Sequence, residues 1–266
     1  MGHRVEIEAG GPSVTTFYLL AFGISWVAWL PVLAGSFGVA MFQSPLWKLA
    51  LVPVAAGPAL AAALAFPVSG HPIPPGRFKA LFEWRVGVRW YAFALLIPPA
   101  LLLIAATVDR LGSREAAPII PALAAAPALF FLLQSVITNP LEEIGWRGFA
   151  LPRLEKRYGA IVASLIVGIL WALWHLPLFV WSGSPMSGYP VWPWVASLLA
   201  ETFVLTWLYN SASRSVLITS LFHISMNLAS VVIGVRSFEV LAATFVVAVI
   251  VLFACVGRTL SSQESR

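Results

Sequence analysis

The stretch LEEIGWRG, residues 141–148, places Glu142, Glu143 and Arg147 together in an otherwise apolar chain. Of the 266 residues, 60% are hydrophobic and only 10% are charged. This composition, with few charges between long apolar runs, is typical of a polytopic membrane protein and excludes an ordinary soluble domain. Charged side chains are costly to place in a membrane, so those that occur there usually serve a function. The stretch is therefore a candidate functional site.

The apolar runs around this stretch predict an all-α, polytopic integral membrane bundle of about eight transmembrane helices. Each run is close to the ~20 residues that cross a hydrocarbon core of ~30 Å. The expected organisation is an N-terminal tail (1–13), one transmembrane domain (14–257) and a C-terminal tail (258–266). The first apolar run is long enough to span a bilayer and is expected to be an uncleaved helix. The expected spans are 14–34, 46–66, 90–108, 119–138, 160–181, 191–210, 214–235 and 237–257.

The basic residues between the spans predict the orientation. With the N-terminus in the cytoplasm, twelve of the 16 lysines and arginines fall on the cytoplasmic side, as the positive-inside rule requires. We therefore expect a multi-pass protein of the cell (inner, plasma) membrane with both termini cytoplasmic. The net charge of +5 is then a topology signal rather than a sign of nucleic-acid binding. The expected partners are the lipid bilayer and a peptide or protein substrate, with no nucleic acid.

Helical spacing separates the two glutamates of the charged stretch. Glu143 and Arg147 are four residues apart with the acid first, which favours an ion pair on one helix face. Glu142 is rotated about 100° from Glu143 around the helix, which leaves its carboxylate available for chemistry. In the alternative interpretation the acids belong to the first turn of a helix that begins at the membrane boundary, with Asn139 as N-cap and Pro140 after it.

Two later apolar segments carry histidines. Trp171 and His175 are four residues apart, as are His223 and Asn227, so each pair shares a helix face. Taken singly, these groups are more simply explained by hydrogen bonds between helices. Glu201 lies inside another span without a spacing partner and is interpreted as a structural or substrate-path residue.

Taken together with Glu142, the two imidazoles supply the groups that water activation needs. Glu142 and His175 fit a general base with histidine assistance, and Glu142, His175 and His223 fit the three protein ligands of a divalent metal such as zinc. The Asn227 amide fits a donor to a developing oxyanion. Hydrolysis of an acyl bond matches these parts, whereas the chain has no G-x-S-x-G, H-E-x-x-H or P-loop motif.

These residues resemble the three motifs of the CPBP intramembrane proteases. That family includes the type II CAAX prenyl endopeptidases and bacteriocin-processing or immunity relatives. The resemblance covers about 140–230. One position departs from the family pattern, because the second motif usually begins with phenylalanine; we expect altered packing or substrate fit there. The matching motifs are Glu142-Glu143-x-x-x-Arg147, Trp171-x-x-x-His175 and His223-x-x-x-Asn227.

The resemblance implies an intramembrane endopeptidase in which Glu142, assisted by His175, activates the attacking water. His223 and Asn227 would stabilise the oxyanion or help to position the water, while Glu143 and Arg147 would hold the helix. Both a metal-dependent and a glutamate-dependent version remain open. The alternatives are a non-catalytic scaffold or immunity-type relative and, less favoured, a small transporter. Catalysis requires the candidate groups to converge, whereas a transport path requires them to be spread across the membrane.

Overall fold

The computed structural model describes residues 11–73, 81, 83–112 and 125–256, and all of its regular elements in these ranges are helical. The predicted tails 1–13 and 258–266 therefore lie almost entirely outside the described residues, as does the start of the expected span 119–138. The longer helices are α1 (Val14–Ser36), α2 (Leu51–Val68), α4 (Val88–Gly112), α5 (Ala125–Gly145), α6 (Leu151–Trp174), α8 (Val191–Ser211), α9 (Val216–Val232) and α10 (Phe238–Val256). The short elements are a π-helical turn, η3 (Trp146–Ala150), helix α7 (Leu176–Val180) and three 3₁₀ turns, η1 (Ala40–Phe42), η2 (Pro45–Ala50) and η4 (Pro185–Gly188).

The helices have the length and apolarity of a membrane protein, which confirms the predicted class. Among the described residues, six helical stretches are long and apolar enough to cross a membrane. One of these, Leu132–Val180, runs through both α5 and α6, while α9 is apolar but shorter. The expected number of eight spans is therefore not confirmed by helix length and composition.

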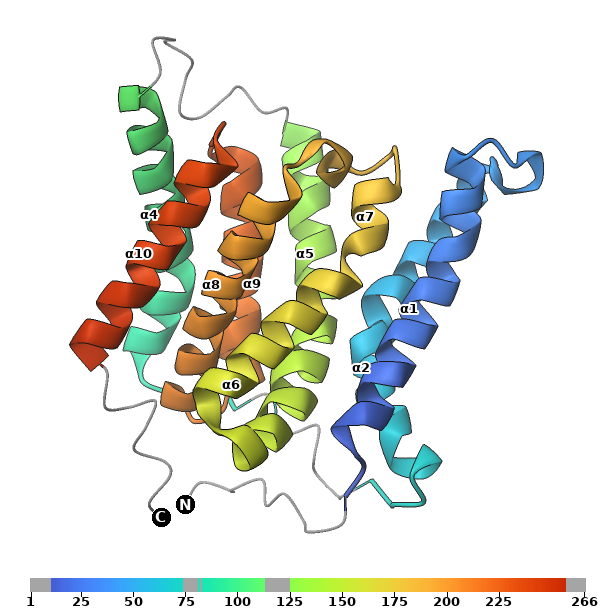
Figure 1. Cartoon of the computed structure of the whole chain (residues 1–266), viewed down its shortest axis with the longest axis horizontal. Coiled ribbons are helices and arrows are strands. Elements are labelled where there is room, and N and C mark those ends of the chain that lie inside the picture. The colour runs from blue at the N-terminus through green and yellow to red at the C-terminus, as the bar shows by residue number, and fades with distance from the viewer. Residues whose placement is uncertain (1–10, 74–80, 82, 113–124, 257–266) are drawn as a thin grey trace.

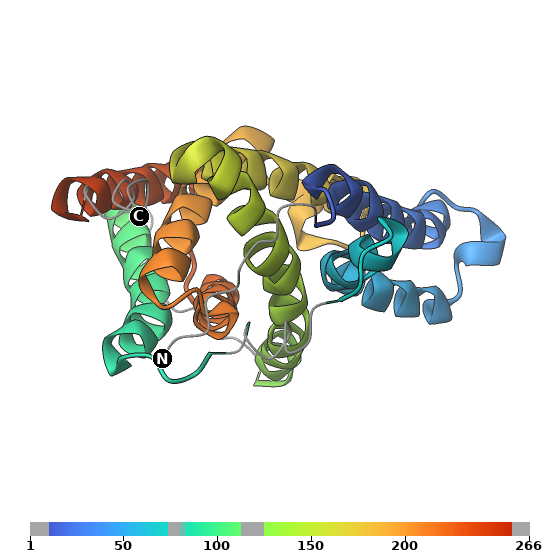
Figure 2. The same cartoon turned by 90° about the horizontal axis from the view of Figure 1, so that it is seen from below.

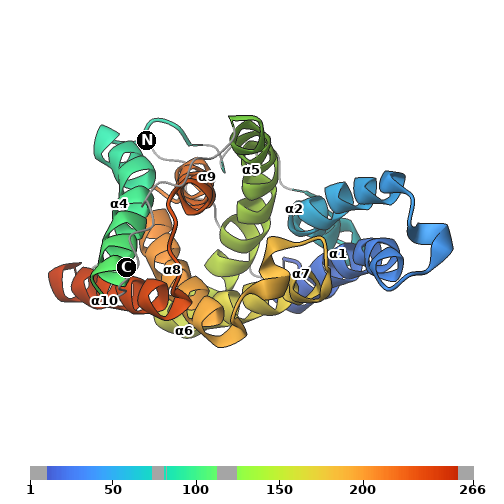
Figure 3. The same ribbon diagram turned by 90° about the horizontal axis from the view of Figure 1, so that it is seen from above.

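The helices form an elongated bundle in which α5 has a central position (Figure 1). Helices α1 and α2 pair at one end, and α4 and α10 lie at the other, as the view from below shows (Figure 2). Seen from above, α5 lies between α2 and α9 and contacts both (Figure 3). The start of α1 and the end of α10 both point toward the lower side of the bundle in this view (Figure 1).

Helix α5 carries the charged stretch deep into the bundle. It continues through Pro140 to Gly145, so the alternative interpretation with a helix start capped by Asn139 is wrong, and so is the expected end of the span at 138. The physical reason is that a segment in lipid satisfies its backbone groups by continuing as a helix, and membrane helices tolerate proline. Gly145 allows α5 to pass close to α2, because a Cβ at this position would lie 2.5 Å from the Cβ of Pro58.

One backbone irregularity overlaps the charged stretch and another follows it. The π-helical turn η3 holds Arg147, and such single turns occur frequently at functional sites. Further on, Gly159 adopts a non-helical conformation (φ 75°, ψ 165°) and kinks α6. A positive φ suits glycine because it has no Cβ. The kink falls one residue before the predicted span 160–181.

Candidate active site

Glu143 and Arg147 form a fully buried ion pair. Nη1 of Arg147 donates to Oε1 of Glu143 at 2.8 Å, and both side chains are 0% exposed. This confirms the pairing predicted from their spacing. The same Oε1 lies 3.1 Å from Nδ1 of His223. Because an ionised carboxylate only accepts hydrogen bonds, Nδ1 of His223 carries the proton. Glu143 thus connects α5 to α9 and leaves Nε2 of His223 outside this bond.

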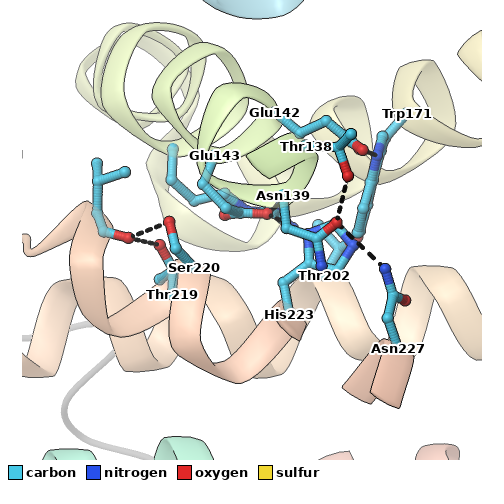
Figure 4. Close-up of polar contacts among 12 residues, drawn as sticks. Thr138, Asn139, Glu142, Glu143, Trp171, Thr202, Thr219, Ser220, His223 and Asn227 are labelled. Atoms are coloured by element: carbon cyan, nitrogen blue, oxygen red, sulfur yellow. Dashed lines mark hydrogen bonds and ion pairs between the residues drawn. The ribbon is translucent and has the colours of Figure 1, made fainter. Parts of the chain in front are cut away.

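Glu142 points away from this ion pair toward α6 (Figure 4). Nε1 of Trp171 donates to Oε2 of Glu142 at 2.9 Å. The Glu142 residue is 7% exposed, compared with 0% for Glu143. Oε1 of Glu142 takes no part in the bond to the indole, so one carboxylate oxygen remains for another partner.

Trp171 brings the candidate groups together. Its indole ring lies 4.6 Å from the guanidinium carbon of Arg147. The imidazole of His223 contacts the ring edge-on at a centroid distance of 5.2 Å, and that of His175 does so at 5.7 Å. Glu142, His175 and His223, which come from α5, the end of α6 and α9, therefore all lie against one buried side chain.

His175 is fixed at the C-terminus of α6. Its Nδ1 lies 2.8 Å from the backbone oxygen of Trp171, one of the carbonyls that a helix end leaves without a helical partner. Since a carbonyl oxygen only accepts, Nδ1 carries the proton and Nε2 has a free lone pair. Glu142 and His223 lie close enough to His175 to interact with it electrostatically. Nε2 of His175 can therefore accept a proton.

Asn227 is held by a residue whose role the sequence did not predict. Its Nδ2 donates to Oδ1 of Asn139 at 3.2 Å, and Oγ1 of Thr138 bonds to the same oxygen (Figure 4). Instead of capping a helix, Asn139 connects α5 to α9. The available signal was its position four residues before Glu143, which places both on the face that meets α9.

Glu201 lies beside this group of residues on α8. It is 8% exposed, and its carboxylate interacts electrostatically with His223, Arg147 and both glutamates of the charged stretch. Its Oε1 has no hydrogen-bond partner among the described residues. The structure thus places Glu201 near the site, although sequence spacing had given it no partner.

The three candidate metal ligands do not form a metal centre in this arrangement. Within the described ranges, no group of three or more His, Cys, Asp or Glu side chains is arranged to hold an ion. Glu142, His175 and His223 each keep one atom of a type that zinc accepts, but their present geometry does not fit the ion.

These features define a class: a polytopic membrane protein whose helices enclose a carboxylate, two imidazoles and an amide suited to hydrolysis. Comparison with known proteins agrees. Residues 124–229, which contain all three motifs, match the family model described as type II CAAX prenyl endopeptidase Rce1-like. The predicted resemblance is thereby confirmed.

The chain is also similar to CAAX prenyl protease 2 of Methanococcus maripaludis. The two sequences are 33% identical over 108 residues, which make up 38% of this chain and 39% of that protein. The chain thus spans well under half the length of this relative.

Proposed function

We propose that the protein is an intramembrane endopeptidase that hydrolyses a peptide bond with water activated by Glu142 and His175. The observation that carries the proposal is the meeting of Glu142, His175 and His223 on the indole of Trp171. Such convergence supports catalysis over a transport path, which would spread these groups across the membrane. The match of residues 124–229 to a model of a protease family supports the same conclusion.

The attacking water binds between Oε1 of Glu142 and Nε2 of His175, the two atoms left free to accept protons. Glu142 takes one proton as the water oxygen attacks the carbonyl carbon of the scissile bond. The carbonyl oxygen then carries a negative charge. Nε2 of His223, when protonated, and the amide of Asn227 donate to this oxyanion. As the intermediate collapses, the proton held by Glu142 passes to the leaving nitrogen, and the C–N bond breaks.

Glu143 and Arg147 support this chemistry without taking part in it. Their ion pair holds α5, and the bond from His223 to Glu143 fixes which imidazole nitrogen faces the substrate. An imidazole held by a carboxylate at Nδ1 keeps a single orientation and a defined tautomer. The same helix thus supplies both the general base and the support for the oxyanion donor.

The substrate class follows from the similar protein that is named a CAAX prenyl protease. We propose a peptide with a CAAX-type C-terminus, reached from the membrane or from the cytoplasm. The proposed location is the plasma membrane, with both termini in the cytoplasm. The asymmetry of the basic residues supports this orientation. The start of α1 and the end of α10 also point toward the same side of the bundle, as both termini in one compartment require (Figure 1).

The direct test is cleavage of an internally quenched CAAX-type peptide, with and without a farnesyl group, by the purified protein in liposomes. We expect cleavage by the wild type and its loss in Glu142→Ala and His175→Ala. Glu239→Ala is the matched control, because it removes an exposed carboxylate at the start of α10. Wild-type rates in both active-site variants would overturn the catalytic assignment. A farnesyl requirement would establish the substrate class.

The same cleavage assay in the presence of a chelator distinguishes the metal-dependent mechanism from the glutamate-dependent one. We expect the glutamate-dependent version, so cleavage should persist in a strong chelator. Loss of cleavage in the chelator and its recovery with zinc would instead favour a metal held by Glu142, His175 and His223.

A further inference from the structure

We propose that Trp171 is a positioning residue that orients Glu142 for catalysis through its indole N–H. This inference rests on the proposed function, because it assigns Glu142 as the base. The bond from Nε1 of Trp171 to Oε2 of Glu142 is 2.9 Å long. A hydrogen bond to an ionised carboxylate is stronger than one between neutral groups. By holding Oε2, the indole restricts rotation of the carboxylate and directs Oε1 toward the water.

Trp171 is itself held on several sides. It is 1% exposed, and the guanidinium of Arg147 lies against its ring. Its backbone oxygen accepts a hydrogen bond from His175, and the imidazoles of His175 and His223 meet its edges. A rigid donor is effective in positioning because little entropy is lost when it orients its partner. The residue thus sets Glu142 and His175 relative to each other across α5 and α6.

Other buried tryptophans of the chain do not use their N–H group in this way. Nε1 of Trp146, Trp174 and Trp207 has no hydrogen-bond partner among the described residues. Burying an indole N–H is therefore possible here without a partner, and the bond to Glu142 is a specific feature of Trp171. Trp207, which packs against Trp90 and Phe93, provides a matched control away from the site.

The first test compares Trp171→Phe with Trp207→Phe in steady-state cleavage. Both changes remove an indole and keep an aromatic ring, but only Trp171→Phe removes the donor to Glu142. We expect Trp171→Phe to lower kcat roughly ten- to a hundredfold, as loss of a hydrogen bond to a charged group implies. KM should stay within about twofold, since the buried indole does not reach substrate. Unchanged or raised kcat, or a loss confined to KM, would overturn the proposal.

A second test does not depend on activity. Melting temperatures are compared for wild type, Trp171→Phe, Glu142→Ala and the double variant. Trp171→Phe should lower the melting temperature by about 2 °C or more in wild type. The same substitution should lower the melting temperature much less in the Glu142→Ala background, where the acceptor of the hydrogen bond is gone. Equal decreases in melting temperature in the wild-type and Glu142→Ala backgrounds would contradict a stabilising hydrogen bond between Trp171 and Glu142. If the melting temperatures show that Trp171 and Glu142 are coupled but the wild type cleaves no peptide, the proposed function is overturned while the hydrogen bond between the two residues is supported.

Discussion

Glu142 and Glu143 are neighbours in the sequence but lie in different surroundings. Glu143 faces α9, is fully buried, and shares one oxygen between Arg147 and His223. Glu142 faces α6, is slightly exposed, and accepts one hydrogen bond from Trp171. The first environment neutralises a carboxylate and fixes the fold. The second leaves a carboxylate oxygen free beside His175.

This difference shows how one helix can separate structural and chemical roles. A rotation of about 100° per residue directs adjacent side chains to different neighbours. The Glu143 side binds helices together, so changes there should affect mainly folding. The Glu142 side holds the free acceptors, so changes there should affect mainly the rate of cleavage.

Apart from Glu142 itself, the largest effect on the cleavage rate is expected when His175 is replaced. His175→Gln should lower kcat roughly 10²–10⁴-fold, because a proton acceptor beside the water is lost. Circular dichroism should show an unchanged helical content. A rate near that of the wild type would exclude His175 from the chemistry.

On the Glu143 side, the expected effect is on stability. Glu143→Ala leaves Arg147 buried without its carboxylate, which costs about 3–5 kcal/mol. Unfolding in a denaturant series should show this loss, while Glu142→Ala should be clearly less destabilised. The double variant Glu143→Leu/Arg147→Met should recover most of the lost stability, since replacing both charges by apolar groups is often neutral. Equal destabilisation by Glu142→Ala and Glu143→Ala would contradict the division of roles.

A smaller loss is expected for the amide pair that connects α5 and α9. Asn227→Ala should lower kcat roughly 10²-fold if its amide donates to the oxyanion. Asn139→Ala should have a weaker effect in the same direction, because Asn139 acts by holding Asn227. A stronger effect of Asn139→Ala, measured at saturating substrate, would reverse these assignments.

The smallest effect is expected for Glu201. Glu201→Gln removes a charge near the site but breaks no hydrogen bond of Oε1 within the described residues. Only electrostatic interactions change, so cleavage should alter about fivefold or less. A loss as large as that of His175→Gln would place Glu201 in the chemistry itself.

The class of fold and the ion pair followed from local rules. Long apolar runs must form helices in a membrane, and a spacing of four residues brings Glu143 to Arg147. These features depend on neighbours along the chain, so the sequence contains enough information to predict them.

The remaining features depend on contacts between distant segments. The bond from Trp171 to Glu142 joins residues 29 positions apart, and that from His223 to Glu143 spans 80 positions. Neither spacing nor composition specifies such a pairing. The alternative helix start at Asn139 failed for a related reason, because the local capping signal was overridden by the need of α5 to continue through the bilayer. The π-helical turn at Arg147 also has no local signal that helical spacing could reveal.

The central claim is that Glu142 activates water while its neighbour Glu143 maintains the fold. It is tested most directly by the cleavage rate per folded molecule of Glu142→Gln, measured beside Glu143→Gln. We predict that Glu142→Gln folds like the wild type and cleaves roughly 10³-fold more slowly or worse, because an amide cannot take the proton. Wild-type cleavage by folded Glu142→Gln would contradict the claim.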